Sequence, residues 1–595
     1  MVKYGFVCFK MMCLVKGELK KIMTGKLDIN EEYAKWVSRA EDDQIKNELE
    51  SIKNNAREIK ERFHKSIEFG TAGLRGVMGA GTNRINIYTV RRATQGLANF
   101  LTEKYLSDIS VAISYDSRNN SGLFAKETAK VLAGNGIKSY ITDKLMPTPF
   151  LSFCVRNLKA QAGVMITASH NTAEYNGYKC YGEDGAQMSE DIASKVFEKI
   201  NSLNIFSDTK ILDFEVAKSL GLIEFVAPSV YEEYEKHVMD QRIFNFPISN
   251  LNVVYTPLNG AGNIPVSKVL KKAGVKDLYV VSSQENPDGN FTTCTYPNPE
   301  NIEAFSEALK VAKEKDADII LATDPDCDRL GVCVKHGSEY KILSGNEIGV
   351  LIFNYILSKR KEAKTLPKKP VAIKSIVSTM MVDSIARNYG CEMREVLTGF
   401  KNIASEILKL EKEERENDYV FGFEESNGYL TGAYVRDKDA VSAALVVSEM
   451  AACYKDEGMN LCEALEKLYN RYGFFGEKTL GFEVKGVDGG KIIEDIMGRL
   501  KNNFSNELKG LDILKVYDYL NSTVFDSRNG KVINEDLPHS NIIRFDLKDN
   551  CKIIVRPSGT EPKIKFYLIM QANSRENLEI YKSTAKKIVE RIMAK

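Results

Sequence analysis

The sequence predicts an α/β protein with three related α/β domains followed by a smaller C-terminal α+β domain. One observation behind this fold class is a plan of apolar strand, polar loop, helix, glycine and second strand. It occurs three times, at 111–142, 252–281 and 371–396. The other is that the chain from about Lys478 onward departs from this plan. The repeats are spaced as domains are, and not as the units of a solenoid.

Each repeat is a βαβ unit of roughly 30 residues. A glycine stands where each helix must stop, and these glycines are Gly136, Gly274 and Gly390. Chance recurrence of βαβ units in a large α/β protein is the alternative. In the C-terminal segment we expect a strand and a helix, then strands at 542–547, 552–556 and 563–571 and an amphipathic helix at 575–592.

A chain of 595 residues is too long for one core, so we divide it into an extension and four domains. The predicted segments are 1–40 (N-terminal extension and first helix), 41–225 (domain I), 226–340 (domain II), 341–475 (domain III) and 476–595 (domain IV). Residues 1–23 mix lysines with short apolar pieces, and no small-residue cleavage site follows. We expect them to lie outside the fold, with Met23 as an alternative start.

Composition excludes several functional classes. With 82 basic and 81 acidic residues the formal net charge is +1, so no whole-molecule field favours nucleic acid or an anionic membrane. Cysteines without a C-x-x-C pair indicate reduced thiols in a cytoplasmic protein, and the five histidines leave little room for a His-rich zinc centre. No apolar stretch approaches the ~20 residues that span a bilayer. We expect a small-molecule partner, and a chain that is monomeric or weakly homodimeric.

Three aspartates at alternate positions, Asp324, Asp326 and Asp328, follow an apolar strand. Carboxylates this close repel one another and are costly to desolvate, so a fold keeps them together mainly when a cation is present. The spacing is not that of an EF-hand loop, because Arg329 and Lys335 stand where that loop needs Gly and Glu. The pattern favours an all-oxygen divalent-metal site at the carboxyl end of a strand. A solvated acidic turn is the alternative.

Two further strand ends carry polar groups. Ser169 and His170 follow the strand 163–166. In extended backbone adjacent side chains diverge, which argues against His170 as a base for Ser169 and against a hydrolase triad. The segment 424–428 follows the strand 419–422, and its carboxylates, hydroxyl and amide suit the neighbouring hydroxyls of a sugar. A solvated turn is again the alternative.

Two loops are suited to anions. The loop 556–563 lies between two strands and combines a guanidinium, hydroxyls, backbone N–H groups and an ammonium, held by two prolines. That combination favours a phosphate cradle over an ordinary hairpin turn. The loop 69–76 is glycine-rich but lacks the Walker Lys-Ser/Thr, so we expect it to place Arg75 near an anion and not to bind a nucleotide.

In their order along the chain these motifs resemble those of the α-D-phosphohexomutases, most closely the long phosphoglucomutase and phosphopentomutase branch. The matching strings are FGTAGLRG at 69–76, TASHN at 167–171, DPDCDRLG at 324–331, GFEESNGY at 422–429 and RPSGTEPKIKFY at 556–567, with YPNPE at 296–300 and LTGFKNI at 397–403. The resemblance covers roughly residues 40–595. It implies mixed sheets in the three α/β domains and four domains around a central cleft, each contributing one loop.

The resemblance implies three groups of site residues. The catalytic group is Ser169, Lys179, Arg75 and His170, with Ser169 as the phosphoserine nucleophile and donor. The metal group, which would hold Mg²⁺, is Asp324, Asp326, Asp328 and the phosphate on Ser169. The substrate-binding group is Arg329, Thr398, Gly399, Glu424, Ser426, Lys438, Arg556, Ser558, Gly559, Thr560 and Lys563.

The implied activity is interconversion of α-D-glucose 1-phosphate and glucose 6-phosphate, with glucose 1,6-bisphosphate as intermediate and activator. Several relatives have a His near the sugar loop. The stretch 434–438 here has none, so Lys179 is the better candidate general base. A second departure is Asn259, where many relatives have His, and it affects only the expected local loop structure.

Three alternatives remain. A phosphopentomutase or phosphomannomutase of the same superfamily is the first, because selectivity among hydroxyl epimers depends on one or two hydrogen bonds. A metal-dependent sugar phosphatase is the second, and it would use the three aspartates without needing Ser169. A catalytically silent sugar-phosphate binding protein is the third, although no motif residue is degraded.

Overall fold

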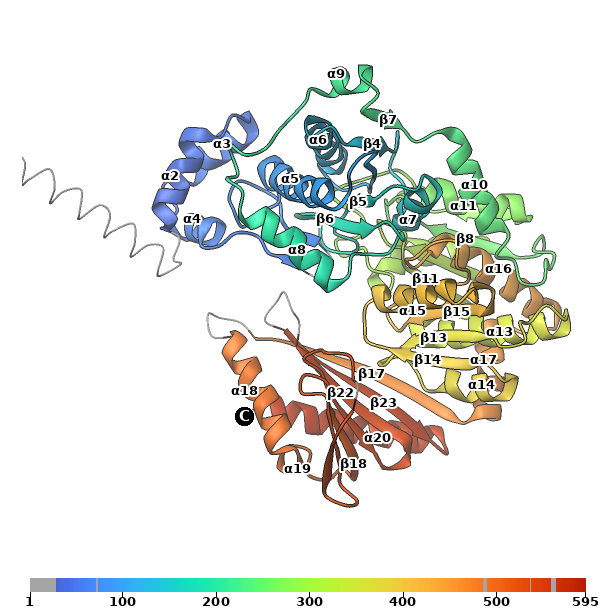
Figure 1. Cartoon of the computed structure of the whole chain (residues 1–595). Coiled ribbons are helices and arrows are strands. Elements are labelled where there is room, and N and C mark those ends of the chain that lie inside the picture. The colour runs from blue at the N-terminus through green and yellow to red at the C-terminus, as the bar shows by residue number, and fades with distance from the viewer. Residues whose placement is uncertain (1–27, 71–72, 485–488, 536, 558–562, 595) are drawn as a thin grey trace, which may run out of the picture.

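The structure is a computed structural model, and it describes residues 28–70, 73–484, 489–535, 537–557 and 563–594. The predicted extension at 1–23 and the predicted phosphate-binding residues Ser558, Gly559 and Thr560 lie outside the described residues. The chain forms four sheets in succession along the sequence, and we name domains I to IV by these sheets (Figure 1).

Domain I is built on a seven-stranded mixed sheet in the order β1-β2-β6-β5-β3-β4-β7. The strands are β1 (Phe69–Gly70), β2 (Gly73–Val77), β3 (Ser110–Tyr115), β4 (Lys138–Ile141), β5 (Ala162–Ile166), β6 (Tyr175–Gly182) and β7 (Ile223–Phe225). β5, β3, β4 and β7 run parallel, whereas β6, β2 and β1 join the sheet antiparallel. β3 and β5 are nearly continuous apolar runs because helices cover both faces of the parallel part.

The helices of this part of the chain are α2 (Ile29–Arg39), α3 (Asp43–Ile52), α4 (Ala56–Phe63), α5 (Ile87–Lys104), α6 (Ser121–Gly134), α7 (Thr148–Asn157), α8 (Glu190–Asn201) and α9 (Phe214–Ser219). The first three precede the sheet and form an N-terminal group. α5 begins at a capping box, in which Asn86 and Thr89 each accept a backbone N–H of the other residue.

Domain II follows helix α10 (Pro228–Met239) and has a five-stranded sheet in the order β12-β11-β10-β8-β9. The strands are β8 (Asn252–Thr256), β9 (Asp277–Val280), β10 (Ile319–Thr323), β11 (Leu330–His336) and β12 (Glu339–Leu343). The helices are α11 (Asn263–Ala273), the 3-10 turn η1 (Ile302–Phe305) and α12 (Ser306–Lys315). β10 is parallel to β8 and antiparallel to β11, so the β10–β11 loop lies where the sheet changes direction.

Domain III has a four-stranded sheet in the order β14-β13-β15-β16. The strands are β13 (Val371–Ser375), β14 (Glu392–Val396), β15 (Tyr419–Glu424) and β16 (Gly428–Leu430). The helices are α13 (Gly345–Glu362), α14 (Met381–Tyr389), α15 (Phe400–Lys412), the 3-10 turn η2 (Glu416–Asp418), α16 (Ala440–Asp456) and α17 (Leu461–Tyr472). α16 is buried on every side and packs against α11 of domain II, so domains II and III share one core.

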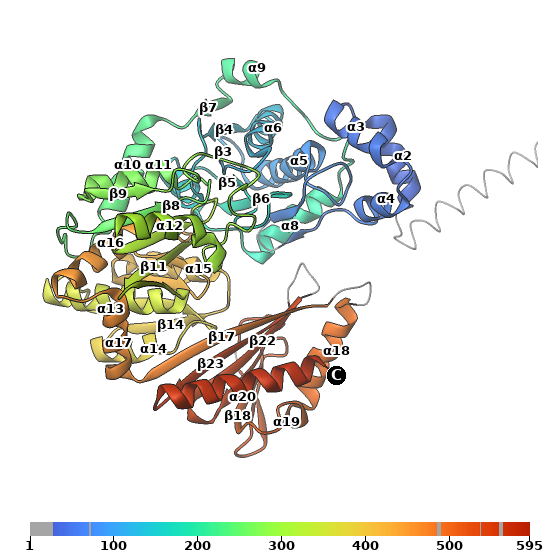
Figure 2. The ribbon, with the colours of Figure 1, turned by 180° about the vertical axis from the view of Figure 1, so that it is seen from behind.

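Domain IV is a seven-stranded, wholly antiparallel sheet in the order β17-β23-β22-β21-β18-β19-β20. The strands are β17 (Phe474–Glu483), β18 (Ile513–Asp518), β19 (Thr523–Asp526), β20 (Lys531–Asn534), β21 (Ile543–Leu547), β22 (Cys551–Pro557) and β23 (Lys563–Ala572). The helices are α18 (Gly489–Asn502), α19 (Phe504–Glu507), the 3-10 turn η3 (Lys548–Asn550) and α20 (Arg575–Met593). Figure 2 shows α20 lying along the sheet, where it packs against β17 and β23.

The predicted fold class is confirmed. In each repeat the two strands pair in parallel, β3 with β4, β8 with β9 and β13 with β14. The stopping glycines Gly136, Gly274 and Gly390 have φ values of 71°, 111° and 67°, in the left-handed region that only glycine adopts at little cost. The strands β18, β19 and β20 were missed, because they are short and half-exposed or exposed, which leaves little periodic apolar signal.

The domains enclose a cleft. Domain IV lies below domain I in Figure 1, and a cavity of about 1260 Å³ lies between domains I, III and IV. Its walls include α8 of domain I, α15 of domain III and the end of β22 in domain IV. Among the described helices, none combines the length and apolar character that crossing a bilayer requires.

Candidate active site

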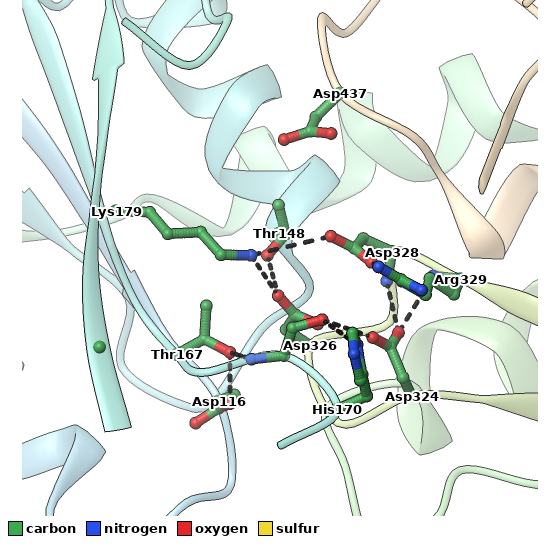
Figure 3. A network of polar contacts seen from close by, with 12 residues as sticks. Asp116, Thr148, Thr167, His170, Lys179, Asp324, Asp326, Asp328, Arg329 and Asp437 are labelled. Carbon is green, nitrogen blue, oxygen red and sulfur yellow. Dashed lines mark hydrogen bonds and ion pairs between the residues drawn. The ribbon is translucent and has the colours of Figure 1, made fainter. Parts of the chain in front are cut away.

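The three aspartates of the β10–β11 loop lie together at the centre of Figure 3. All three are buried, and a carboxylate oxygen of each lies within 4.8 Å of the others. Oδ1 of Asp326 and Oδ1 of Asp328 are buried and have no hydrogen-bond partner among the described residues. Buried polar atoms in proteins are normally satisfied, so two orphaned carboxylate oxygens in an all-oxygen cluster fit a divalent cation such as Mg²⁺. Burial and the charges of Asp328 and Asp326 raise the pKa of Asp324 well above its usual range.

Two lysines, one from domain I and one from domain III, balance part of this charge. Lys179 of β6 donates to Oδ2 of Asp326 at 2.8 Å, and Lys438 lies 2.9 Å from Oδ2 of Asp328. Burial acts to raise the pKa of Asp326, but Lys179 outweighs burial and lowers it. Burial acts to lower the pKa of Lys438, but Asp328 and Asp437 raise it. Predicted catalytic and substrate-binding lysines thus contact the predicted metal ligands.

Ser169 lies directly against the aspartates, although it comes from another domain. Its hydroxyl donates to Oδ2 of Asp324 at 2.9 Å. The residue has a φ of 52°, which is uncommon for a side-chain-bearing residue and turns the chain sharply after β5. In this conformation the Ser169 hydroxyl lies 3.2 Å from Nδ1 of His170. The prediction that the two side chains diverge is therefore wrong, because it assumed extended backbone.

His170 is still poorly suited to hold a proton. Burial, and then the charges of Arg329 and Arg75, lower its pKa well below the ordinary histidine value. The ring packs edge-on against Tyr296, with 6.0 Å between centroids. An imidazole of such low pKa retains a transferred proton weakly.

Two predicted arginines lie beside this group. Arg75, on β2, donates to Oδ1 of Asn171 at 3.2 Å, which places it next to the Ser169 loop. Arg329 follows the aspartates directly, and its Nη1 lies 2.5 Å from Oε1 of Glu300. One guanidinium group therefore lies beside the Ser169 loop and the other beside the aspartate loop.

The predicted sugar loop is joined to a second predicted segment. Oε1 of Glu424, at the end of β15, accepts the backbone N–H of Gly399 at 2.6 Å, so Thr398 and Gly399 lie beside the sugar loop. Glu425 accepts the Ser375 hydroxyl at 3.1 Å. Burial and the neighbouring Glu424 charge raise the pKa of Glu425 to about 7. Ser426 stands in the β15–β16 turn next to these carboxylates.

The predicted phosphate-binding residues of domain IV stand on the far wall of the cleft. Arg556 lies near the end of β22 and Lys563 begins the antiparallel partner β23. Arg556, Thr398 and Gly399 all line the 1260 Å³ cavity, so the cavity connects the end of β22 with the 398–399 segment that contacts Glu424.

Several residues that contact the site were missed by sequence reasoning. Thr148, the first residue of α7, donates from both its backbone N–H and its hydroxyl to Asp326, each at 2.9 Å. Asp437 accepts Tyr181 and Gln187 of domain I at 2.8 and 3.0 Å. A polar residue between two prolines, as at 147–149, was the only local signal for Thr148, and nothing local points to the others.

The chain is similar to known proteins along most of its length. Three family models match, described as Phosphoglucomutase/phosphomannomutase, alpha/beta/alpha domains I, II and III, at residues 66–204, 232–337 and 344–472. A phosphoglucomutase of Staphylococcus aureus is 37% identical over 542 residues, which cover 90% of this chain and 95% of that protein.

Solved structures agree in fold. A phosphoglucomutase/phosphomannomutase family protein of Burkholderia thailandensis has a TM-score of 0.63 at 18% identity, covering 87% of this chain and 96% of its own. Parafusin of Paramecium, titled a phosphoglucomutase in its open form, has a TM-score of 0.63 at 17% identity, covering 88% of this chain and 95% of its own. With the ordered motifs and the 37% identity, these matches show that the chain belongs to the phosphoglucomutase/phosphomannomutase family of α-D-phosphohexomutases.

Proposed function

We propose that this enzyme interconverts α-D-glucose 1-phosphate and glucose 6-phosphate through a phosphoserine at position 169. One observation carries the proposal: the Ser169 hydroxyl lies 2.9 Å from Asp324, in a buried cluster of three aspartates with two orphaned oxygens. The name and 37% identity of the Staphylococcus aureus phosphoglucomutase support glucose phosphate as the substrate.

The chemistry follows from the residues around Ser169. A sugar hydroxyl attacks the phosphorus of phosphoserine 169, so a P–O bond to the sugar forms while the P–Oγ bond breaks. The hydroxyl gives up a proton and Oγ of Ser169 takes one up. The bisphosphate then turns end for end, and the reverse transfer returns the other phosphate to Ser169.

Charge neutralisation is the main task of the protein in such a transfer. Arg75 and Lys179 would flank the phosphoryl group, and Asp324, Asp326 and Asp328 would hold Mg²⁺ together with the Ser169 phosphate. When bound, Mg²⁺ neutralises charge on the phosphoryl oxygens.

Proton transfer centres on Lys179 in this proposal. Its ammonium donates to Asp326 at 2.8 Å, so in this state it can supply a proton but cannot accept one. To act as the general base it must first lose this proton.

In this proposal the substrate-binding residues lie on two walls of the cleft. The non-reacting phosphate would bind Arg556, Lys563 and the 558–560 segment, while Glu424 and Ser426 would accept and donate hydrogen bonds to sugar hydroxyls. Thr398 and Gly399 would border the sugar, and Arg329 and Lys438 the metal side. Because both orientations of the bisphosphate present one remote phosphate, a single phosphate site serves both half-reactions.

The test is a mutase assay primed with glucose 1,6-bisphosphate, combined with phosphopeptide mass spectrometry around Ser169. Wild type should interconvert the glucose phosphates and carry phosphate on Ser169, whereas Ser169→Ala should lose mutase turnover and Ser219→Ala, on α9, should not. Full activity in Ser169→Ala, with steady release of inorganic phosphate, would identify a metal-dependent phosphatase. Faster turnover of ribose 1-phosphate or mannose 1-phosphate would identify the phosphopentomutase or phosphomannomutase alternative.

Three further expectations belong to this proposal. We place the enzyme in the cytoplasm, and the nine cysteines among the described residues are all free thiols, as a reduced compartment requires. We expect a monomer or weak homodimer, which light scattering after size exclusion will measure. We retain the predicted domain boundaries at 40/41, 225/226, 340/341 and 475/476, which limited proteolysis will test.

A further inference from the structure

One guanidinium binds the loop that carries Ser169. Arg118, on the turn after β3, donates to the backbone carbonyl oxygens of Ser169 at 2.5 Å, Thr172 at 2.8 Å and Tyr175 at 3.1 Å, and also to that of Asn171. Its side chain is fully buried. Four carbonyls spread over seven residues thus converge on one planar donor.

The loop depends on this donor because it satisfies few of its own carbonyls. Buried backbone oxygens without donors are costly, and a guanidinium presents five N–H groups in a fixed fork. The same turn also holds the amide side of the loop. Asp116, 3.4 Å from Arg118, accepts the Thr167 hydroxyl at 2.6 Å, and that hydroxyl accepts the Ser169 N–H at 2.8 Å. The two peptide groups that flank the Ser169 Cα are therefore both hydrogen-bonded, one through its N–H and the other through its carbonyl, which supports the positive φ of Ser169.

A phenylalanine of domain II covers one face of the Arg118 guanidinium. The Phe291 ring lies 4.9 Å from the Arg118 guanidinium carbon and is almost completely buried. Its neighbour Asn290 accepts the Asn119 side-chain amide at 2.8 Å. Gly289 approaches so closely that a Cβ there would lie 2.5 Å from the backbone nitrogen of Asn119. The contact is therefore tight and specific to these residues.

The same segment of domain II is linked to the metal loop. Asn259, in the loop after β8, donates its side-chain amide to the Asn286 carbonyl at 2.8 Å and its backbone N–H to the Gln284 carbonyl at 2.9 Å. Two residues later, the Ala261 N–H donates to the carbonyl of Pro325, inside the aspartate loop, at 2.8 Å. These contacts therefore connect the Ser169 loop to the aspartate loop by a second route, in addition to the hydrogen bond between Ser169 and Asp324.

We propose that Arg118, backed by Phe291, is a positioning residue that holds the Ser169 loop in register with the aspartate loop for phosphoryl transfer. The proposal rests on the proposed function, because it concerns the phosphate that Ser169 would carry. Arg118 touches backbone carbonyls and not the substrate, so it acts through the position of the serine. A displacement of about 1 Å at a reacting group costs about 10²-fold in rate.

The variants are chosen to keep volume and charge. Arg118→Lys keeps the charge beside Asp116 but cannot reach four carbonyls with one ammonium, and Phe291→Leu keeps an apolar neighbour without a ring face. The matched controls are Arg242→Lys, where a half-buried arginine also donates to a backbone carbonyl, and Phe305→Leu in the core of domain II.

Two readouts separate positioning from general destabilisation. Arg118→Lys should lower kcat about 10²-fold per folded enzyme with KM for glucose 1-phosphate within threefold, and Phe291→Leu should lower kcat about 3- to 10-fold. Hydrogen exchange of the 167–176 peptide should accelerate at least tenfold in Arg118→Lys and not in the controls, a readout that needs no substrate. Unchanged exchange in Arg118→Lys, or equal kcat losses in the controls, overturns the proposal. Absence of mutase activity in wild type, with the exchange result as expected, refutes the proposed function alone.

Discussion

Lys179 should be one of the two lysines that balance the aspartate cluster when no metal is bound. Its ammonium lies 2.8 Å from Asp326 and 3.8 Å from Asp328, and all three side chains are buried. At 2.8 Å two unit charges attract by about 6 kcal/mol at an effective dielectric constant of about 20. Removing one partner of a buried pair costs about 3–5 kcal/mol, because the other charge stays buried and unpaired.

The perturbation is Lys179→Met, which keeps most of the side-chain length and removes the charge. The Asp326 carboxylate retains the hydrogen bond from the Thr148 hydroxyl, so we expect a loss near the lower limit, about 3 kcal/mol. For a cooperative unit the size of domains I and II this lowers the thermal midpoint by about 6 °C. Mg²⁺ at about 100 times its Kd for Lys179→Met adds about 2.7 kcal/mol to that variant, so the variant in Mg²⁺ should regain most of the difference from wild type in EDTA.

The assay is thermal unfolding of Lys179→Met and wild type in EDTA and in Mg²⁺. The control is Lys310→Met, which removes an equally short ion pair, 2.6 Å to Glu307, from the exposed face of α12. Exposed pairs contribute about 0–1 kcal/mol, so this variant should unfold within about 2 °C of wild type in both buffers. A Lys179→Met midpoint in EDTA equal to that of the control, or a loss that Mg²⁺ does not reduce, would refute the reasoning.

Three other predictions follow from single contacts. Gly73→Ala should abolish activity and reduce soluble yield, because φ at Gly73 is 109° and a Cβ would lie 2.0 Å from the carbonyl oxygen of Tyr178; the activity of purified protein measures this. Glu424→Gln should raise KM for glucose 1-phosphate about tenfold with a smaller effect on kcat, since it weakens both the Gly399 hydrogen bond and the grip on sugar hydroxyls. Glu477, whose pKa burial raises to about 7, binds a proton more tightly in the folded than in the unfolded chain. Its stabilisation is complete below pH about 4.5 and is lost as pH rises through 7, so Glu477→Gln should flatten the decline in unfolding free energy between pH 5 and 8, which denaturant titrations will measure.

The architecture and the site differ in how much local sequence reveals. The βαβ repeats were predictable because apolar strand runs and helix-stopping glycines are local patterns, and Gly274 and Gly390 cap their helices as expected. The short strands β18 to β20 were not, since a half-exposed strand of four to six residues has little periodicity. The buried helix α16 shows the same limit, because an all-round apolar helix identifies burial but not its partner.

The candidate site shows the same division. The aspartate loop and the Ser169 loop were recognisable as residue types at strand ends, because such ends carry chemistry in α/β sheets. Thr148 and Arg118 were not, because each acts across a long sequence separation, on Asp326 and on the Ser169 loop. The relation between Ser169 and His170 was predicted wrongly, because backbone dihedral angles at a turn depend on distant donors.

The sequence by itself determined the fold class, the order of the domains and the family, since each is written in consecutive residues. Only the tertiary structure decided that a serine of domain I donates to an aspartate of domain II, that Lys179 and Lys438 balance part of the charge of that cluster, and that one arginine binds the serine loop. The physical reason is the separation along the chain over which each kind of interaction acts. Propensity and periodicity act over a few residues, whereas the electrostatics and positioning of this site arise from groups brought within 3 Å by the packing of separate domains.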